Sequence, residues 1–413
     1  MKIEGRQIDE YLWDEEIIGR KMVFLSGPRQ VGKTTYARGL LARGRKGGYF
    51  SWDNPLVRRA YAADPFFFLK DRGSAPDYLA IFDEIHKRHR WKDILKGIYD
   101  SIDPSSRILV TGSARLEWFR KSGDSLVGRY AHFHMLPLSV TELAKAPFAD
   151  AWLGRATDWK APWASLKKKL ETAPPAGTRA IYDHLFTFGG FPEPASRASE
   201  RFLRKWQSDY LSLLLTEDLR DATGIRAVDT VESLVALLPG RVGSPLSVSA
   251  LSRDLETTHP SVRNYLLQLE KLWLTFSIRP WSRRLGRVLR KEKKAYFTHW
   301  PFAGEDQRVH ENMLASILLR ACLAWSDAGM GEAALWYVRT FEGREADFLV
   351  VLDGKPAVLV EAKWSETSVD TGLRNIAARI GIPLVQVVHT PGILRVEDDI
   401  IVVSADRFLR ALP

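Results

Sequence analysis

Residues 21–35 read KMVFLSGPRQVGKTT, and this stretch decides the fold of the first part of the chain. The apolar run of residues 22–25 indicates a buried strand, and a helical pattern begins at Thr34. Between them, Gly27–Thr34 fits the pattern G-x-x-x-x-G-K-S/T, in which glycines let the backbone curl so that its N–H groups face phosphates. Because a strand precedes this loop and a helix follows it, the sequence predicts a phosphate-binding loop (P-loop).

The side chains of this loop have separate expected roles. Lys33 is expected to neutralise the β- and γ-phosphates of ATP, and the Thr34 hydroxyl to bind Mg²⁺. Thr35 is expected to cap the helix or to contact the α-phosphate, near the partial positive charge of the helix N-terminus. The expected nucleotide-binding residues are Gly27, Pro28, Arg29, Gln30, Val31, Gly32, Lys33, Thr34 and Thr35.

A second apolar strand, Leu79–Phe82, leads directly into Asp83 and Glu84. A carboxylate at the end of such a strand can hold Mg²⁺ beside the phosphates, and we expect this of Asp83. Hydrolysis also needs a base for the attacking water, and we expect Glu84 to supply it. The alternative for Glu84 is a solvated carboxylate at a strand end.

Two further groups are candidates for the hydrolytic step. The apolar run of residues 108–110 leads into small polar residues, so that Thr111 or Ser113 could orient the lytic water. Arg129 could sense the γ-phosphate, or it could be a surface arginine in a loop. The expected catalytic set is Lys33, Glu84, Ser113 and Arg129.

Strands that alternate with helices over the first 110 residues predict βαβ units and a parallel sheet, so the expected fold class is α/β. A length of 413 residues predicts more than one domain. We expect a short amphipathic helix in residues 1–20. The expected division is a P-loop domain at 1–144, a variable insert and linker at 145–200, a helical lid with a winged helix-turn-helix at 201–300, and a further α/β domain at 301–413.

The winged helix is expected because Val248–Leu255 and Ser261–Leu272 read as two helices around a polar break. Two strand-like runs then flank a densely basic loop, where a winged helix has its wing. Arg and Lys bind DNA phosphates by electrostatics that are independent of base sequence. The expected DNA contacts are Arg263, Asn264 and Gln268 on the second helix and Arg283, Arg284, Arg287, Arg290 and Lys291 in the loop; the alternative is a solvated hairpin.

The C-terminal part of the chain reads α-β-β-β-α-β. A hairpin turn at Asp353–Gly354 would bring Glu361 and Lys363, which share one face of a strand, beside Asp347. This is the layout of metal-dependent endonucleases, in which Asp347 and Glu361 would hold Mg²⁺ and Lys363 would stabilise the reacting phosphate. Glu311 on the preceding helix could add a carboxylate. The alternative is a fold that binds a partner and cleaves nothing.

Composition and net charge limit the classes of protein to which the chain can belong. With 45% hydrophobic and 27% charged residues the chain should fold, and its net charge of +10 favours polyanionic partners. The single cysteine, Cys322, excludes an intrachain disulfide and a cysteine-rich metal site. The N-terminal residues lack the apolar segment of a signal peptide, and no apolar run approaches the length that spans a bilayer. We therefore expect a soluble, cytoplasmic protein without membrane contact.

Six segments together resemble a known family. They are GPRQVGKTT (27–35), IFDEIH (81–86), VTGSARL (110–116), SLVGRY (125–130), PLSVTEL (137–143) and GGFPEP (189–194). In this order they resemble bacterial and archaeal AAA-type P-loop ATPases that carry a C-terminal domain of unknown function. The resemblance implies an AAA-like core, a winged-helix region and a restriction-endonuclease-like PD-(D/E)xK domain. His86 departs from the pattern, since the family more often has glutamine there.

Three functional hypotheses follow, and all use ATP and Mg²⁺. In the first, ATP binding and hydrolysis reposition the winged-helix and nuclease-like domains on DNA. In the second, the chain is a nucleotide switch that acts on protein partners. In the third, it is an ATP-gated, metal-dependent DNA nuclease. DNA is the expected partner, while a homo-oligomer or a protein partner is left open.

Overall fold

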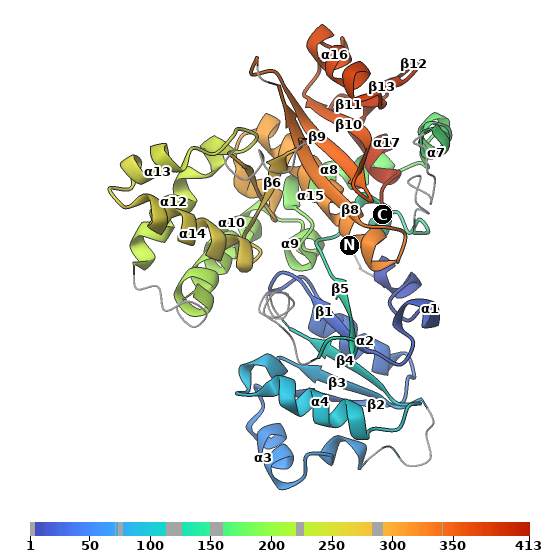
Figure 1. Cartoon of the computed structure of the whole chain (residues 1–413), viewed down its shortest axis with the longest axis vertical. Helices are drawn as coiled ribbons and strands as arrows, with labels where there is room; N and C mark the ends of the chain where they lie inside the picture. Colours follow the sequence, from blue (N-terminus) through green and yellow to red (C-terminus); the bar gives the residue numbers. More distant parts are fainter. Residues whose placement is uncertain are drawn as a thin grey trace. The chain divides into compact units, whose positions relative to one another are not determined.

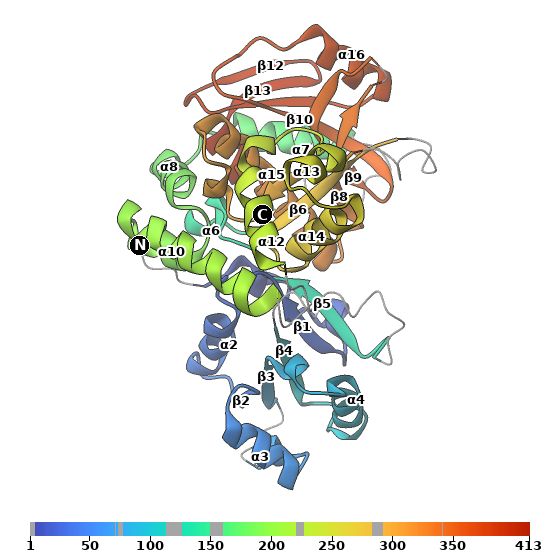
Figure 2. The ribbon, with the colours of Figure 1, turned by 90° about the vertical axis from the view of Figure 1, so that its left-hand side faces the viewer.

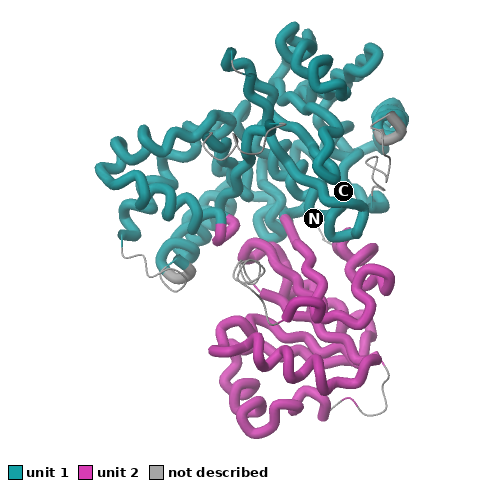
Figure 3. Tube along the Cα trace, viewed as in Figure 1, with its two compact units in different colours: residues 1–3, 137–270, 274–413 teal, residues 4–136, 271–273 magenta. Residues whose placement is uncertain are grey.

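The computed structural model describes residues 5–70, 72, 77–112, 126–148, 160–219, 227–282, 292–340 and 342–413. The chain forms two compact units (Figure 3). Unit 2 comprises Glu4–Leu136 with Lys271–Trp273, and unit 1 comprises Met1–Ile3, Pro137–Glu270 and Leu274–Pro413. This two-unit description does not decide the expected four-segment division, which stays a prediction.

In its described residues unit 2 is built on a parallel sheet of five strands in the order β2-β3-β4-β1-β5 (Figure 1). The expected strands near residues 22, 79 and 108 are confirmed to within about two residues. The strands are β1 (Met22–Ser26), β2 (Gly47–Ser51), β3 (Leu79–Asp83), β4 (Arg107–Thr111) and β5 (Tyr130–His134). The P-loop follows β1, which lies between β4 and β5.

Helices α2 (Lys33–Ala42), α3 (Pro55–Ala63) and α4 (Trp91–Ser101) belong to unit 2, and α2 packs against β2 and β4. Successive side chains of a strand point to opposite faces of a sheet. On one face, Phe24, Phe82 and Val110 join Trp91 and Leu95 of α4 in a buried hydrophobic cluster. This core fixes the strands whose carboxyl ends carry the candidate site.

The single helix expected in residues 1–20 is wrong within the described part of this segment. Gln7–Glu10 forms a 3₁₀ turn (η1), and Glu15–Ile18 forms a separate short helix, α1. The Asp14 side chain accepts a hydrogen bond from the Glu16 backbone N–H and so caps α1. A capping aspartate starts a new helix, which explains the interruption.

Unit 1 begins with helices, and residues 145–200 are more regular than their sequence suggested. The described part of that segment contains α7 (Lys160–Glu171), α8 (Thr178–Phe188) and α9 (Pro192–Arg197). The helices that follow are α10 (Glu200–Leu213), α12 (Val228–Leu237), α13 (Val248–Asp254) and α14 (His259–Lys271), with a π-helical turn, η5 (Leu214–Asp218), after α10. Residues 137–143 also pack in this unit, because Arg320 Nη1 donates to the Pro137 carbonyl at 3.1 Å.

The described part of unit 1 also contains a mixed sheet of eight strands in the order β12-β13-β11-β10-β9-β8-β6-β7. Figures 1 and 2 show α12, α13 and α14 beside the β6 end of this sheet. The strands are β6 (Thr275–Pro280), β7 (Lys294–Phe297), β8 (Ala333–Arg339), β9 (Glu345–Leu352), β10 (Lys355–Lys363), β11 (Leu384–Val388), β12 (Leu394–Glu397) and β13 (Ile400–Ser404), with helices α15 (Asp306–Asp327), α16 (Thr371–Ile380) and α17 (Ala405–Arg410).

The expected order α-β-β-β-α-β is confirmed by α15, β8, β9, β10, α16 and β11. The hairpin turn is also confirmed, since Asp353 (φ 48°) and Gly354 (φ 76°) both adopt positive φ between β9 and β10. This element order does not by itself establish a restriction-endonuclease-like fold. Among the described residues, none of the helices combines the length and the apolar character needed to cross a bilayer.

Candidate functional site

The backbone of the P-loop requires glycine at its first position. Gly27 has φ 150°, and a Cβ added there would lie 2.0 Å from the Met135 carbonyl oxygen. Gly32 caps the N-terminus of α2 with φ 104°, a conformation that other residues rarely adopt. The loop therefore turns sharply from the end of β1 into the N-terminus of α2, which is the geometry that presents backbone N–H groups to an anion.

Lys33 is held inside this loop. Its side chain is buried, and its ammonium group donates to the carbonyl oxygens of Gly27 at 2.8 Å and Pro28 at 2.6 Å. The lysine thus braces the loop from within and keeps its charge at the phosphate-binding position.

The two halves of the predicted site meet at Asp83. The Thr34 hydroxyl donates to Asp83 Oδ2 at 3.1 Å. This contact joins the start of α2 to the end of β3, two segments separated by 49 residues. The oxygens of Thr34 and Asp83 are therefore close enough together to bind the same metal ion. Since Mg²⁺ is typically held by one or two carboxylates together with substrate phosphates and waters, these residues fit it.

Two hydroxyl groups orient Asp83 from neighbouring strands. Thr111, at the end of β4, is buried and donates to Asp83 Oδ1 at 2.5 Å, and Tyr49 on β2 donates to Oδ2. The guanidinium of Arg38 lies 4.4 Å from the centre of the Tyr49 ring. The sequence drew attention to Thr111 as a water-orienting residue, but it gave no signal for Tyr49, whose role depends on strand order.

Glu84 has an unusual backbone conformation for a non-glycine residue, with φ 57°. Its N–H donates to the Thr111 carbonyl at 2.9 Å, and its carboxylate Oε2 lies 3.2 Å from His86 Nε2. Burial raises the pKa of Glu84, although the Lys33 ammonium opposes this shift. A carboxylate with a raised pKa is a better proton acceptor, as a general base requires. His86, the departure from the family pattern, thus contacts the expected base.

The structure does not bring Arg129 to the P-loop of its own chain, and its position fits the alternative of a surface arginine. The Arg129 carbonyl accepts from the N–H of Met22, the first residue of β1, whereas the P-loop follows Ser26, the last residue of β1. Arg129 therefore lies at the amino-terminal ends of the strands, whereas the P-loop of its own chain lies at their carboxyl ends. Its guanidinium instead pairs with Asp100, with Nε and Oδ1 3.0 Å apart. Ser113 lies outside the described residues.

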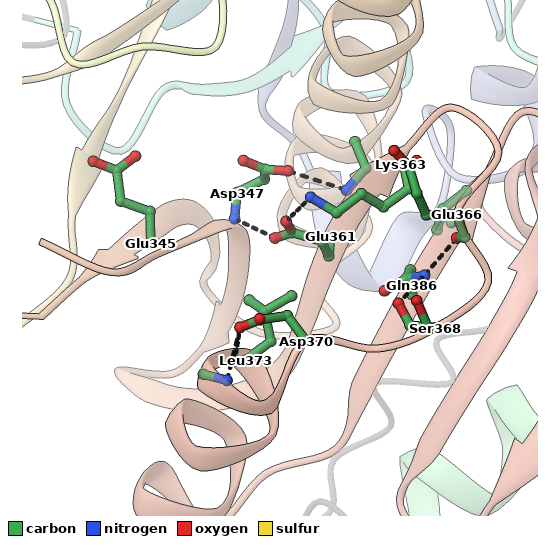
Figure 4. Close-up of polar contacts among 12 residues, drawn as sticks. Glu345, Asp347, Glu361, Lys363, Glu366, Ser368, Asp370, Leu373 and Gln386 are labelled. Atoms are coloured by element: carbon green, nitrogen blue, oxygen red, sulfur yellow. Dashed lines mark hydrogen bonds and ion pairs between the residues drawn. The ribbon is translucent and has the colours of Figure 1, made fainter.

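In unit 1 the structure brings Asp347, Glu361 and Lys363 together (Figure 4). Glu361 Oε2 accepts from the Asp347 N–H at 3.1 Å, and Glu361 Oε1 lies 2.8 Å from the Lys363 ammonium. The sequence missed Lys294 on β7, whose ammonium lies 3.1 Å from Asp347 Oδ1. Its only sequence signal is a place in the basic run that ends at β7.

The structure does not bring Asp347, Glu361 and Glu311 together as the expected metal site, which stays a prediction. Within the described ranges, no group of three or more His, Cys, Asp or Glu side chains is placed to hold a metal ion. Burial raises the pKa of Glu311 and that of Glu361, and the nearby Asp347 carboxylate adds to both shifts.

The candidate DNA residues are only partly described. Arg263 and Asn264 are exposed on α14, whereas Gln268 is buried and donates to Asn264 Oδ1 at 2.9 Å. Gln268 is therefore wrong as a DNA contact. The loop residues Arg283, Arg284, Arg287, Arg290 and Lys291 lie outside the described part of the chain.

Comparison with known families bears on unit 2 first. Residues 19–144 match the family described as AAA domain. This range contains the P-loop, Asp83 and Glu84, and the match supports a P-loop ATPase. Residues 179–299 match a domain of unknown function, DUF8612, which covers α13, α14, β6 and β7. That description assigns no activity to the helical part of unit 1.

Similar proteins add little about activity. The chain is 23% identical over 398 residues to uncharacterized proteins of Mycobacterium bovis and Mycobacterium tuberculosis, which covers 94% of this chain and 81% of each relative. A Walker-type ATPase of Pyrococcus abyssi is similar in structure at 16% identity, covering 71% of this chain and 93% of that protein. Its TM-score of 0.39 is too low to carry an argument about the fold.

Proposed function

We propose that the P-loop residues 27–35, with Asp83 and Glu84, bind Mg·ATP and hydrolyse it. The observation that carries this proposal is the hydrogen bond from Thr34 to Asp83, because it joins the phosphate-binding loop to the metal-binding strand. The match of residues 19–144 to AAA domains supports the same activity.

Each residue has a role that follows from its position. The backbone N–H groups of residues 27–34 bind the phosphates, and Lys33 neutralises the charge that grows on them during transfer. Bound Mg²⁺ would be held by Thr34 and Asp83 and would help to neutralise the charge of the phosphates. Glu84 accepts a proton from the attacking water, while Thr111 and Tyr49 keep Asp83 in place.

The proposal predicts ATP hydrolysis that requires a divalent metal ion. Steady-state turnover of the purified full chain should be measured in Mg²⁺ and again after the metal is removed with EDTA. We expect turnover in Mg²⁺ and its loss in EDTA, with recovery when excess Mg²⁺ is restored. Equal turnover in both conditions would contradict the proposal.

A second proposal concerns DNA, and it is favoured by the order of elements in unit 1. Two helices, α13 and α14, precede the antiparallel strands β6 and β7, and the sequence between these strands, residues 281–293, is rich in arginine and lysine. A winged helix has this order. β6 also pairs with β8, so the pair of strands continues into the larger sheet. We propose that α14 and the basic segment 281–293 contact DNA phosphates without base specificity.

The adjacent pair Arg283 and Arg284 offers a matched test of DNA binding. Changing both to serine should weaken binding to duplex DNA. The slope of the logarithm of the affinity against the logarithm of the salt concentration should become less steep by about two, because two fewer phosphates are neutralised. The control is the same change at Arg58 and Arg59, an exposed pair on α3 in unit 2. Fluorescence anisotropy over a salt series measures both quantities. If the two double variants behave alike, the segment 281–293 is not the contact.

A further inference from the structure

Lys294, the first residue of β7, is a charged side chain in an almost completely buried position. Its side chain is 1% exposed. Its ammonium lies 3.1 Å from Asp347 Oδ1 and 3.5 Å from Glu345 Oε2, and 5.4 Å from the centre of the Tyr337 ring. A buried ammonium group is stable only when it is paired, so these contacts compensate its removal from water.

The carboxylates that would form a nuclease metal site already have partners within the fold. Asp347 uses Oδ1 for Lys294 and Oδ2 for the N–H of Ala362, at 3.1 Å in both cases. Glu361 uses Oε1 for the Lys363 ammonium and Oε2 for the N–H of Asp347. Figure 4 shows Asp347, Glu361 and Lys363 turned toward one another. A metal ion would therefore have to share oxygens that already accept hydrogen bonds from the backbone and from side chains.

The third carboxylate of the expected metal site is also enclosed. Tyr296, on the same strand as Lys294, donates its hydroxyl to Glu311 Oε1 at 2.9 Å. Gly243 lies so close to the other oxygen that a Cβ added there would be 2.4 Å from Glu311 Oε2. β7 thus supplies a partner to two of the expected metal ligands, Lys294 to Asp347 and Tyr296 to Glu311.

We propose that Lys294 is a built-in counter-ion that replaces a divalent metal ion at Asp347, so that this nuclease-like cluster is a structural ion-pair network joining β7 to β9. A second cation bound at Asp347 would lie within a few ångströms of the ammonium and would be repelled by it. The network holds the edge strand β7 on the domain, and it performs no metal-dependent cleavage of DNA. Asp347, Glu361 and Lys363, which resemble a catalytic site in the sequence, therefore stabilise the fold.

The test is to measure Mn²⁺ binding to the full chain in the absence of nucleotide. Electron paramagnetic resonance reports this binding, because the signal of free Mn²⁺ decreases as the ion is bound. Mn²⁺ suits oxygen ligands of this kind. The wild-type chain and Asp347→Asn should bind Mn²⁺ equally, because Asp347 is not a ligand while Lys294 is present. Lys294→Met keeps the length of the side chain and removes its charge, and it should gain about one Mn²⁺ site per chain.

Three controls make this test decisive. Lys355→Met removes the charge of an exposed lysine at the start of β10 and should gain no Mn²⁺ site. Adding Asp347→Asn to Lys294→Met should abolish the gained site. The midpoint temperature of thermal unfolding should be lower in Lys294→Met than in the wild type, and Mn²⁺ should raise it again. Any effect of Mn²⁺ on the midpoint of the wild type should be the same in Asp347→Asn.

Two results would overturn the proposal. One is wild-type Mn²⁺ binding that Asp347→Asn removes, since the cluster would then already be a metal site. The other is a folded Lys294→Met variant that gains no Mn²⁺ site, since the ammonium would then not be what excludes the metal. If Lys294→Met does not fold, the comparison of wild type with Asp347→Asn still decides whether Asp347 is a metal ligand.

Discussion

ATP turnover in Lys33→Ala is expected to fall by at least about 10²-fold relative to the wild type, the usual cost of removing one preorganised charge from a site where negative charge develops. The buried ammonium is fixed by the carbonyl oxygens of Gly27 and Pro28. It is therefore already in position when phosphates enter the loop. Because alanine also removes these two hydrogen bonds, we expect weaker ATP binding as well as slower hydrolysis.

The matched control is Lys21→Ala, which removes an exposed lysine just before β1. It should hydrolyse ATP as fast as the wild type does. Circular dichroism and thermal unfolding of both variants show whether the fold is retained. Unchanged turnover in a folded Lys33→Ala variant would remove the P-loop from the mechanism.

Glu84→Gln is expected to reduce turnover by about 10²- to 10⁴-fold, the range that a general base contributes, and to leave ATP binding almost unchanged. Glutamine has the same shape but cannot accept a proton from water. The contact with His86 Nε2, at 3.2 Å from the carboxylate in the wild type, keeps the side chain directed. The separation of binding from turnover distinguishes this variant from Lys33→Ala.

The pH profile gives Glu84 a further signature. A general base acts only when it is ionised, so the wild-type rate should fall as the pH is lowered through the pKa of Glu84. Burial raises that pKa, and the fall should therefore begin at a higher pH than an ordinary glutamate would give. Glu84→Gln should lack this acid limb, while the exposed control Glu16→Gln should keep it. An acid limb that persists in Glu84→Gln would assign the base to another group.

Local sequence was sufficient for the parts of the site that lie within a few residues of one another. The glycines of the P-loop and the strand that ends in Asp83 carry their own backbone signals, so their strands and the helix α2 were predicted to within about two residues. The meeting of Thr34 with Asp83 required one further assumption, that the carboxyl ends of parallel strands share an edge. The hydrogen bond between them bears out that assumption.

Contacts that depend on strand order could not be predicted. Tyr49 reaches Asp83 because β2 is the neighbour of β3, and Arg129 is removed from the P-loop because β5 runs parallel to β1. Neither pairing follows from local patterns. Residues 160–197 form helices although their sequence lacks a clear apolar period, because contacts with the rest of unit 1 outweigh local propensity.

The nuclease-like cluster of Asp347, Glu361 and Lys363 was likewise predicted only in part from the sequence. The spacing of Glu361 and Lys363 and the turn at Asp353–Gly354 correctly predicted that these side chains approach Asp347. Lys294 lies 53 residues before Asp347 and reaches it through the pairing of β6 with β7 and with β8. A motif search finds the carboxylates, but it does not find the cation that neutralises them.

The central claim is that one magnesium-bound nucleotide contacts both the P-loop and the end of β3. The most direct measurement is equilibrium titration with a fluorescent ATP analogue of the wild type, Lys33→Ala and Glu84→Gln, in Mg²⁺ and in EDTA. We expect tight binding to the wild type and Glu84→Gln only when Mg²⁺ is present, and weak binding to Lys33→Ala in both conditions. Equal affinity of all three chains, with no effect of EDTA, would place the nucleotide elsewhere and contradict this account.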